Sequence, residues 1–186
     1  INKTFLEVTS RHDGKKYPMA LSALLDIPWI KQKQNTVVCV NSPEHSDNGL
    51  EKEILKYLPK SIFIPDYVQL DQAFGCLLAR SLIDRNEDLF IGACDNGFDI
   101  DLRAFNELKR TSDMIVFTHT DDLNIRNDPF AHSWLSLKRN SSSIKKLSFK
   151  QTISEIPFKD HATTGMFWFK NSKIFLGFLE KMILSN

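Results

Sequence analysis

The apolar positions along the chain follow two spacings. Helical spacing predicts four helices, at 49–58, 71–83, 102–108 and 174–183. Continuous or alternating apolar runs predict strands at 35–40, 61–64, 89–93, 114–118, 133–137 and 165–169. Because strands and helices alternate with short connections, we expect βαβ units and a Rossmann-like, three-layer α/β/α fold with a mostly parallel central sheet. We see no repeat or linker, so we expect one domain over residues 1–186.

Composition narrows the class of protein. The chain has 24 basic and 23 acidic residues, a net charge of +1, which gives no electrostatic support for a nucleic-acid partner. Its apolar stretches are too short for membrane insertion, so we expect a cytoplasmic protein. The three cysteines are widely spaced, which favours free thiols in a reducing compartment. The chain opens on Ile1, which leaves open a domain incomplete at both ends; an oligomer also stays open.

Asp95 is the first candidate for chemistry. It comes just after the apolar run 89–93 and is followed by Asn96 and Gly97. In open α/β sheets, ligands bind outside the carboxyl ends of strands, where an acid can hold a divalent metal that neutralises a phosphate. An ordinary Asp-Asn-Gly turn after a strand explains the same residues equally well.

Three further segments carry polar side chains next to predicted elements. Asp71–Gly75 opens a helix, where exposed amides favour anions or base edges, although an Asp N-cap is the commoner use. Asp160–Gly165 places polar and small residues before an aromatic strand, either as a sugar or phosphate site or as a plain loop. Thr9–Gly14, followed by two lysines, offers Arg11 as a phosphate clamp or is simply a basic surface loop. We expect Asp128–Trp134 to pack a loop on the next strand.

The order of these segments resembles the sugar-nucleotidyltransferase family of GT-A-like folds, and within it the capsular-polysaccharide type. The likeness runs from about Gly49 to Met182 and is carried by Leu89-Phe-Ile-Gly-Ala-Cys-Asp-Asn96 and Asp160-His-Ala-Thr-Thr-Gly-Met-Phe-Trp-Phe169. It implies a Mg²⁺-dependent reaction that joins a nucleoside triphosphate to a sugar phosphate or similar phosphomonoester and releases pyrophosphate, with in-line attack on the α-phosphorus.

The resemblance also implies roles for individual residues. Asp95 matches the metal-binding aspartate of the family. The other candidates are Arg11 and Lys16 as catalytic residues; Ser10, Gln72, Ala73 and Asn96 for the nucleotide; and Asp160, His161, Thr164 and Gly165 for the acceptor.

The chain departs from the family near its start. The family has a Gly-rich loop ending in Gly-Ser-Arg-Phe, of which this chain keeps Ser10 and Arg11 without the glycines, and Pro18 is followed by Met19 instead of a lysine. Two alternatives therefore stay open. One is a GT-A-type glycosyltransferase that uses a nucleotide-sugar donor, with Asp99 and Asp101 as its acidic pair. The other is a catalytically inactive nucleotide-binding or regulatory module.

Overall fold

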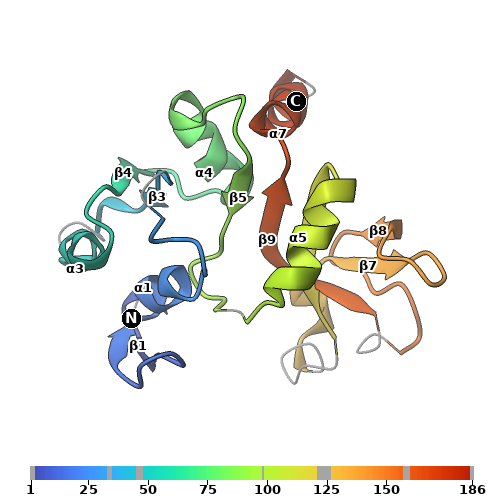
Figure 1. Cartoon of the computed structure of the whole chain (residues 1–186), viewed down its shortest axis with the longest axis horizontal. Helices are drawn as coiled ribbons and strands as arrows, with labels where there is room; N and C mark the ends of the chain where they lie inside the picture. The colour runs from blue at the N-terminus through green and yellow to red at the C-terminus, as the bar shows by residue number, and fades with distance from the viewer. Residues whose placement is uncertain are drawn as a thin grey trace. The chain divides into compact units, whose positions relative to one another are not determined.

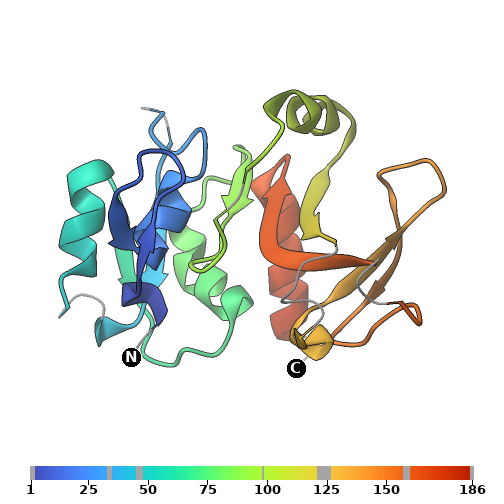
Figure 2. The ribbon, with the colours of Figure 1, turned by 90° about the horizontal axis from the view of Figure 1, so that it is seen from below.

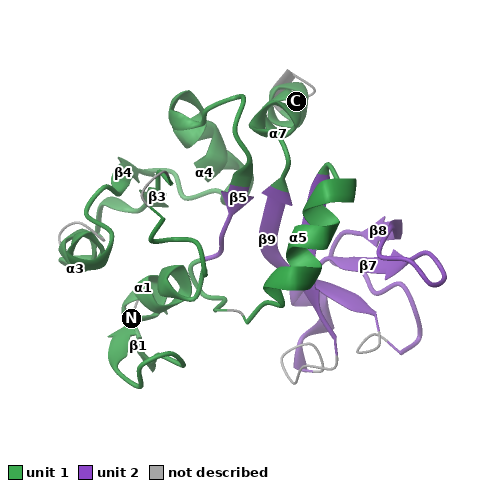
Figure 3. Cartoon of the chain, in the orientation of Figure 1, with its two compact units in different colours: residues 1–89, 94–113, 169–186 green, residues 90–93, 114–168 purple. Residues whose placement is uncertain are grey.

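The structure is a computed structural model, and it describes residues 3–32, 35–44, 48–97, 99–120, 127–156 and 160–184. Contacts divide the chain into two compact units, 1–89 with 94–113 and 169–186, and 90–93 with 114–168 (Figure 3).

The elements are η1 (Lys3–Phe5), β1 (Glu7–Thr9), β2 (Lys16–Pro18), α1 (Met19–Leu25), β3 (Val38–Asn41), α3 (Leu50–Tyr57), β4 (Ile62–Pro65), α4 (Gln72–Ala79), η2 (Arg80–Leu82), β5 (Leu89–Ile91), α5 (Leu102–Thr111), β6 (Met114–His119), η3 (Pro129–Ala131), β7 (Trp134–Leu137), β8 (Ile144–Ser148), β9 (His161–Phe169) and α7 (Ser172–Leu184) (Figure 1).

The first unit contains a βαβ arrangement. Strands β3 and β4 pair in parallel, from Val38 opposite Ile62 to Asn41 opposite Pro65, and α3 connects them. Helix α4 packs against β3, where Gly75 faces Val40: a Cβ built on Gly75 would lie 3.5 Å from Val40 Cγ1, an ordinary van der Waals contact. The expected βαβ unit is confirmed in this part of the chain.

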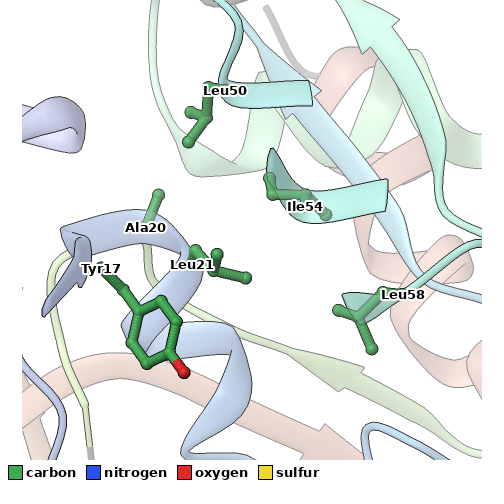
Figure 4. Close-up of a cluster of buried hydrophobic side chains, with 6 residues drawn as sticks. All are labelled: Tyr17, Ala20, Leu21, Leu50, Ile54 and Leu58. Atoms are coloured by element: carbon green, nitrogen blue, oxygen red, sulfur yellow. The ribbon is translucent and has the colours of Figure 1, made fainter. Parts of the chain in front are cut away.

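The core of the first unit joins α1 to α3 (Figure 4). Its buried side chains are Tyr17, Ala20, Leu21, Leu50, Ile54 and Leu58. Burial of each large aliphatic side chain stabilises the fold by about 1.5–3 kcal/mol. Tyr17 also meets Tyr57 edge to face, with ring centroids 5.4 Å apart. This cluster holds the end of α1 in place, and the candidate site is built at that end.

The second unit is organised around β9. The sheet has the order β5-β9-β7-β8, with β6 also paired to β9. Strand β7 is antiparallel to both β8 and β9, and Trp134, opposite Ala162, is completely buried. Trp134 Nε1 donates to the carbonyl of Pro129 at 2.9 Å, so the predicted packing of this loop on its strand is confirmed.

The expected mostly parallel sheet is therefore wrong. The connection from β7 to β8 spans only 138–143, and such a short turn permits only antiparallel pairing (Figures 1 and 2). The α/β class itself is confirmed. All three cysteines are free thiols; Cys39 and Cys76 are partly buried, whereas Cys94 is exposed rather than buried as expected. Within the described residues, no helix has both the length and the hydropathy needed to cross a membrane.

Candidate functional site

Asp95 lies in the segment that leaves β5 for α5. The strand ends at Ile91, two residues earlier than expected, so Asp95 stands in a bend beyond the strand rather than directly at its end. Its Oδ2 accepts a hydrogen bond from Lys3 Nζ, and its Oδ1 accepts from the side-chain Nδ2 of Asn96 at 3.4 Å. The side chain keeps 35% of its surface exposed. The carboxylate is thus reachable from solvent and already faces one cation.

Lys3 is the residue that the sequence did not reveal. It belongs to η1, 92 positions from Asp95, and no local pattern links the two. The hydrogen bond to Asp95 raises the pKa of the Lys3 ammonium above its ordinary value, so this cation stays charged at neutral pH. Asp95 therefore has a permanent positive partner within the chain.

Asp26 ends helix α1 and is nearly completely buried, with 5% of its side chain exposed. A buried carboxylate is costly unless it is paired. Arg11 Nη2 donates to Asp26 Oδ2 at 2.8 Å, and His12 Nε2 lies 3.1 Å from Oδ1. Asp26 therefore fixes the position of Arg11, whose side chain remains 57% exposed.

Gly97, which follows Asp95 and Asn96 in the chain, lies against the Asp26–Arg11 pair. A Cβ built on Gly97 would lie 2.1 Å from Asp26 Oδ2 and 2.8 Å from Arg11 Nη2, closer than real Cβ atoms come. Any side chain at this position would require Asp26 or Arg11 to move. The structure thus brings Arg11, predicted as catalytic, next to the segment that holds Asp95 and Asn96.

The turn between β1 and β2 positions Arg11 from the other side. Thr9 is opposite Lys16 in the pair of strands, and Lys16 is exposed. Ser10 is buried, and its hydroxyl accepts a hydrogen bond from the amide of His12 at 3.2 Å. Ser10, predicted to bind nucleotide, is therefore directed into its own turn.

Gln72 and Ala73 form the first turn of α4. The side chain of Asp71 caps this helix and accepts from the amide of Phe74 at 2.8 Å, which is the ordinary N-cap arrangement. Gln72 is exposed at this helix start. Likewise, Asp101 caps α5 through the amides of Arg103 and Ala104, a use that disfavours its assignment to a glycosyltransferase acid pair.

The predicted acceptor residues lie in the second unit. His161, Thr164 and Gly165 belong to strand β9 rather than to a loop, because β9 begins at His161, four residues before the expected start, and Asp160 immediately precedes it. His161 Nδ1 is 3.1 Å from Thr118 Oγ1, and Thr164 Oγ1 donates to the carbonyl of Phe117 at 3.0 Å. Both contacts connect β9 to β6.

Of the remaining two acceptor candidates, Asp160 directly precedes β9 and Gly165 lies at its middle. Asp160 accepts from the amide of Ser154 at 2.9 Å. Gly165 has a φ of +75°, a left-handed conformation that favours glycine, and a Cβ there would lie 3.9 Å from Ala93 Cβ. In the described part of the chain, no group of three His, Cys, Asp or Glu side chains is arranged to hold a metal by itself.

Comparison with known proteins shows the fold. No family model matches the chain, and no curated protein matches its sequence. It is similar to a crystal structure of UDP-glucose pyrophosphorylase complexed with UDP-glucose, with a TM-score of 0.55 and 15% sequence identity over 90% of this chain and 67% of that chain. The class that the structure defines is therefore an α/β fold shared with a pyrophosphorylase.

Proposed function

We propose that this chain is a cytoplasmic, magnesium-dependent nucleotidyltransferase. It joins a nucleoside triphosphate to a sugar phosphate or similar phosphomonoester and releases pyrophosphate, for surface polysaccharide biosynthesis. The observation that carries the proposal is the placement of Arg11 against Gly97, in the same segment as Asp95. The fold supports it, because the similar pyrophosphorylase was crystallised with UDP-glucose, a nucleotide joined to a sugar.

Arg11 is suited to a triphosphate. A guanidinium has five N–H donors in a planar fork that matches phosphate oxygens. One nitrogen bonds to Asp26, and more than half of the side chain is exposed, so other donors can reach a ligand. Lys16 adds a second exposed cation on β2. Together they would stabilise negative charge that develops on the phosphates in the transition state.

The proposed reaction is a single displacement at phosphorus. A phosphate oxygen of the acceptor forms a bond to the α-phosphorus. The bond from that phosphorus to the bridging oxygen of the β-phosphate breaks, and pyrophosphate leaves with the electron pair. Because the chain supplies no covalent intermediate in this scheme, positioning and charge account for catalysis.

Asp95 would hold the magnesium ion. Mg²⁺ is commonly bound by one or two carboxylates while substrate phosphates and waters complete its shell, so one exposed carboxylate beside the amide of Asn96 fits that use. When bound, the ion would neutralise phosphate charge. Lys3 must then share or leave the carboxylate, since its ammonium occupies Oδ2.

The remaining assignments follow the order of the segments. We assign the exposed start of α4, at Gln72 and Ala73, to the nucleobase, since amides at a helix start favour polar base edges. We assign the first half of β9, with the preceding Asp160, to the acceptor.

Release of pyrophosphate tests the proposal. The full chain is incubated with each nucleoside triphosphate, a panel of sugar phosphates and Mg²⁺. We expect turnover with one combination, and a fall of about 100-fold or more in Arg11→Lys, because loss of one oriented donor costs about 10²–10³. Arg103→Lys is the matched control, since Arg103 is 90% exposed on α5. Full activity in Arg11→Lys, or in Asp95→Asn, would contradict the assignment.

One observation favours an alternative, a nucleotide-binding module without catalysis. The ammonium of Lys3 already balances Asp95, where the proposed enzyme needs a metal. In that case, calorimetry would show nucleotide binding of equal strength with and without Mg²⁺, and no turnover. Lys3→Met would weaken this binding, whereas in the enzyme it would leave Asp95 more accessible and strengthen the dependence on Mg²⁺.

A further inference from the structure

The hairpin formed by β7 and β8 carries an unusual concentration of positive charge. We use the name basic hairpin for residues 138–150, which are the turn after β7, strand β8 and the two residues that follow it. They contain five basic side chains and no acidic one: Lys138, Arg139, Lys145, Lys146 and Lys150. The whole chain has a net charge of only +1, so the rest of it is net acidic. The positive charge is therefore gathered in one place and is not a property of the whole chain.

Every residue of the basic hairpin except Ser148 is exposed. Among the residues that the structure describes, none of its five cations forms an ion pair. Elsewhere, ion pairs engage such lysines as Lys56 with Glu53 and Lys109 with Asp88. The basic hairpin thus presents charge that nothing in the described part of the chain neutralises.

Large apolar side chains are interleaved with these cations. Ile144, Leu147 and Phe149 are 43%, 64% and 76% exposed. Lys150 Nζ lies 5.8 Å from the centroid of the Phe149 ring. Leu147 belongs to β8, which ends the order of its sheet, and it pairs with the buried Leu135. Exposed apolar groups that adjoin one another mark interaction sites more often than isolated ones do.

We propose that the basic hairpin docks the protein on membrane surfaces that contain anionic lipids. Lipid phosphate and carboxylate groups complement its unpaired cations, and basic segments bind such surfaces through this attraction. The apolar side chains would enter the boundary between head groups and acyl chains. This inference rests on the second unit alone and stands independently of the proposed reaction.

The residues favour a lipid surface over a nucleic acid. Sequence-tolerant binding of single strands depends on aromatic side chains that stack on successive bases. The basic hairpin has one aromatic residue, Phe149, whereas Ile144 and Leu147 are aliphatic and have no stacking face. Transfer of aliphatic side chains from water to hydrocarbon is instead favourable.

Sedimentation with lipid vesicles tests the proposal. The full chain is mixed with vesicles of phosphatidylcholine, and with vesicles in which phosphatidylserine replaces about a third of that lipid. We expect binding only to the second kind, weakening as salt is added. Lys145→Gln with Lys146→Gln should lower the partition coefficient about 25-fold, since each cation contributes about fivefold. Leu147→Ser with Phe149→Ser should lower it about tenfold or more, while the salt dependence remains.

The matched control is Lys52→Gln with Lys60→Gln, which removes the same charge from exposed positions in the first unit. It should bind as the unchanged chain does. Equal binding to both kinds of vesicle, unchanged binding by the hairpin variants, or an equal loss in the control would each overturn the proposal. So would binding of a single-stranded oligonucleotide through the hairpin without binding of vesicles. The substituted side chains are exposed, so matching thermal melts confirm that each variant is folded.

Discussion

Substitution of Gly97 by alanine perturbs the contact on which the candidate site depends. The added methyl group would lie 2.1 Å from Asp26 Oδ2, so the carboxylate must move by about 0.9 Å to regain the 3.0 Å minimum that real Cβ atoms keep. Asp26 is buried and held by Arg11 at 2.8 Å, which leaves little room for that movement. We therefore expect the pair to separate or the 95–97 segment to shift.

The cost has two parts. Forcing an extra methyl group into a packed position costs about 1–3 kcal/mol. The loss of the Arg11 contact adds about 1 kcal/mol or less, because the exposed guanidinium is screened by solvent. Alanine also restricts the unfolded chain more than glycine does, which stabilises the folded state and offsets part of this cost. We expect a net loss of about 2 kcal/mol, which lowers the melting temperature by about 4–8 °C in a chain of this length.

Thermal melts followed by circular dichroism measure the effect, and two other glycines calibrate it. Gly177 lies within α7 with nothing within 4 Å of a built Cβ, so Gly177→Ala should stabilise the protein by about 0.5–1 kcal/mol. Gly75→Ala meets only an ordinary contact at 3.5 Å and should be close to neutral or stabilising. If Gly97→Ala melts as high as the unchanged chain, the described contact with Asp26 is wrong.

Three other predictions concern stability and reactivity. Tyr17 donates to Asp13 at 2.7 Å, which lowers the pKa of Asp13 and raises that of Tyr17. The hydrogen bond therefore stabilises the fold at pH values between the ordinary pKa values of Asp13, 3.8, and Tyr17, 10.0. Its contribution is lost as the pH falls below the first value or rises above the second. The difference in melting temperature between Tyr17→Phe and the unchanged chain should shrink outside that pH range. Trp134→Phe should lower the free energy of unfolding, measured in urea, by about 1–3 kcal/mol, because it leaves a void and removes the hydrogen-bond donor to the Pro129 carbonyl. Burial raises the pKa of Cys39 to about 12 and that of Cys76 to about 11, so iodoacetamide at neutral pH should label both far more slowly than it labels a free cysteine.

Local pattern predicted most of the helices. Helices α3, α4, α5 and α7 lie where apolar residues recur at helical spacing. Helix α1 was missed because Met19–Leu25 is seven residues long and almost wholly apolar, so it has no polar face to reveal a period. The start of β9 was missed for the opposite reason. Its polar residues indicate a loop, and pairing with β7 and β6, which the local sequence does not contain, makes them a strand.

The candidate site depends on contacts that no local pattern contains. Asp95 and Arg11 were predicted from motifs, but their partners Lys3 and Asp26 are 92 and 15 positions away from them in the chain. The parallel sheet was expected from the order of elements, whereas pairing direction is set by where each strand finds its neighbour. Motifs therefore suggested candidate chemical groups, and tertiary packing decided which of those groups lie next to one another.

Phosphorus NMR of the reaction mixture tests the central claim most directly. With the full chain, Mg²⁺, the preferred nucleoside triphosphate and a sugar phosphate, we expect signals of pyrophosphate and of a nucleoside diphosphate-sugar to grow in equal amounts. Asp95→Asn should abolish both signals. Growth of inorganic phosphate alone, or of no new signal with any pair of substrates, would contradict the assignment of this chain as a nucleotidyltransferase.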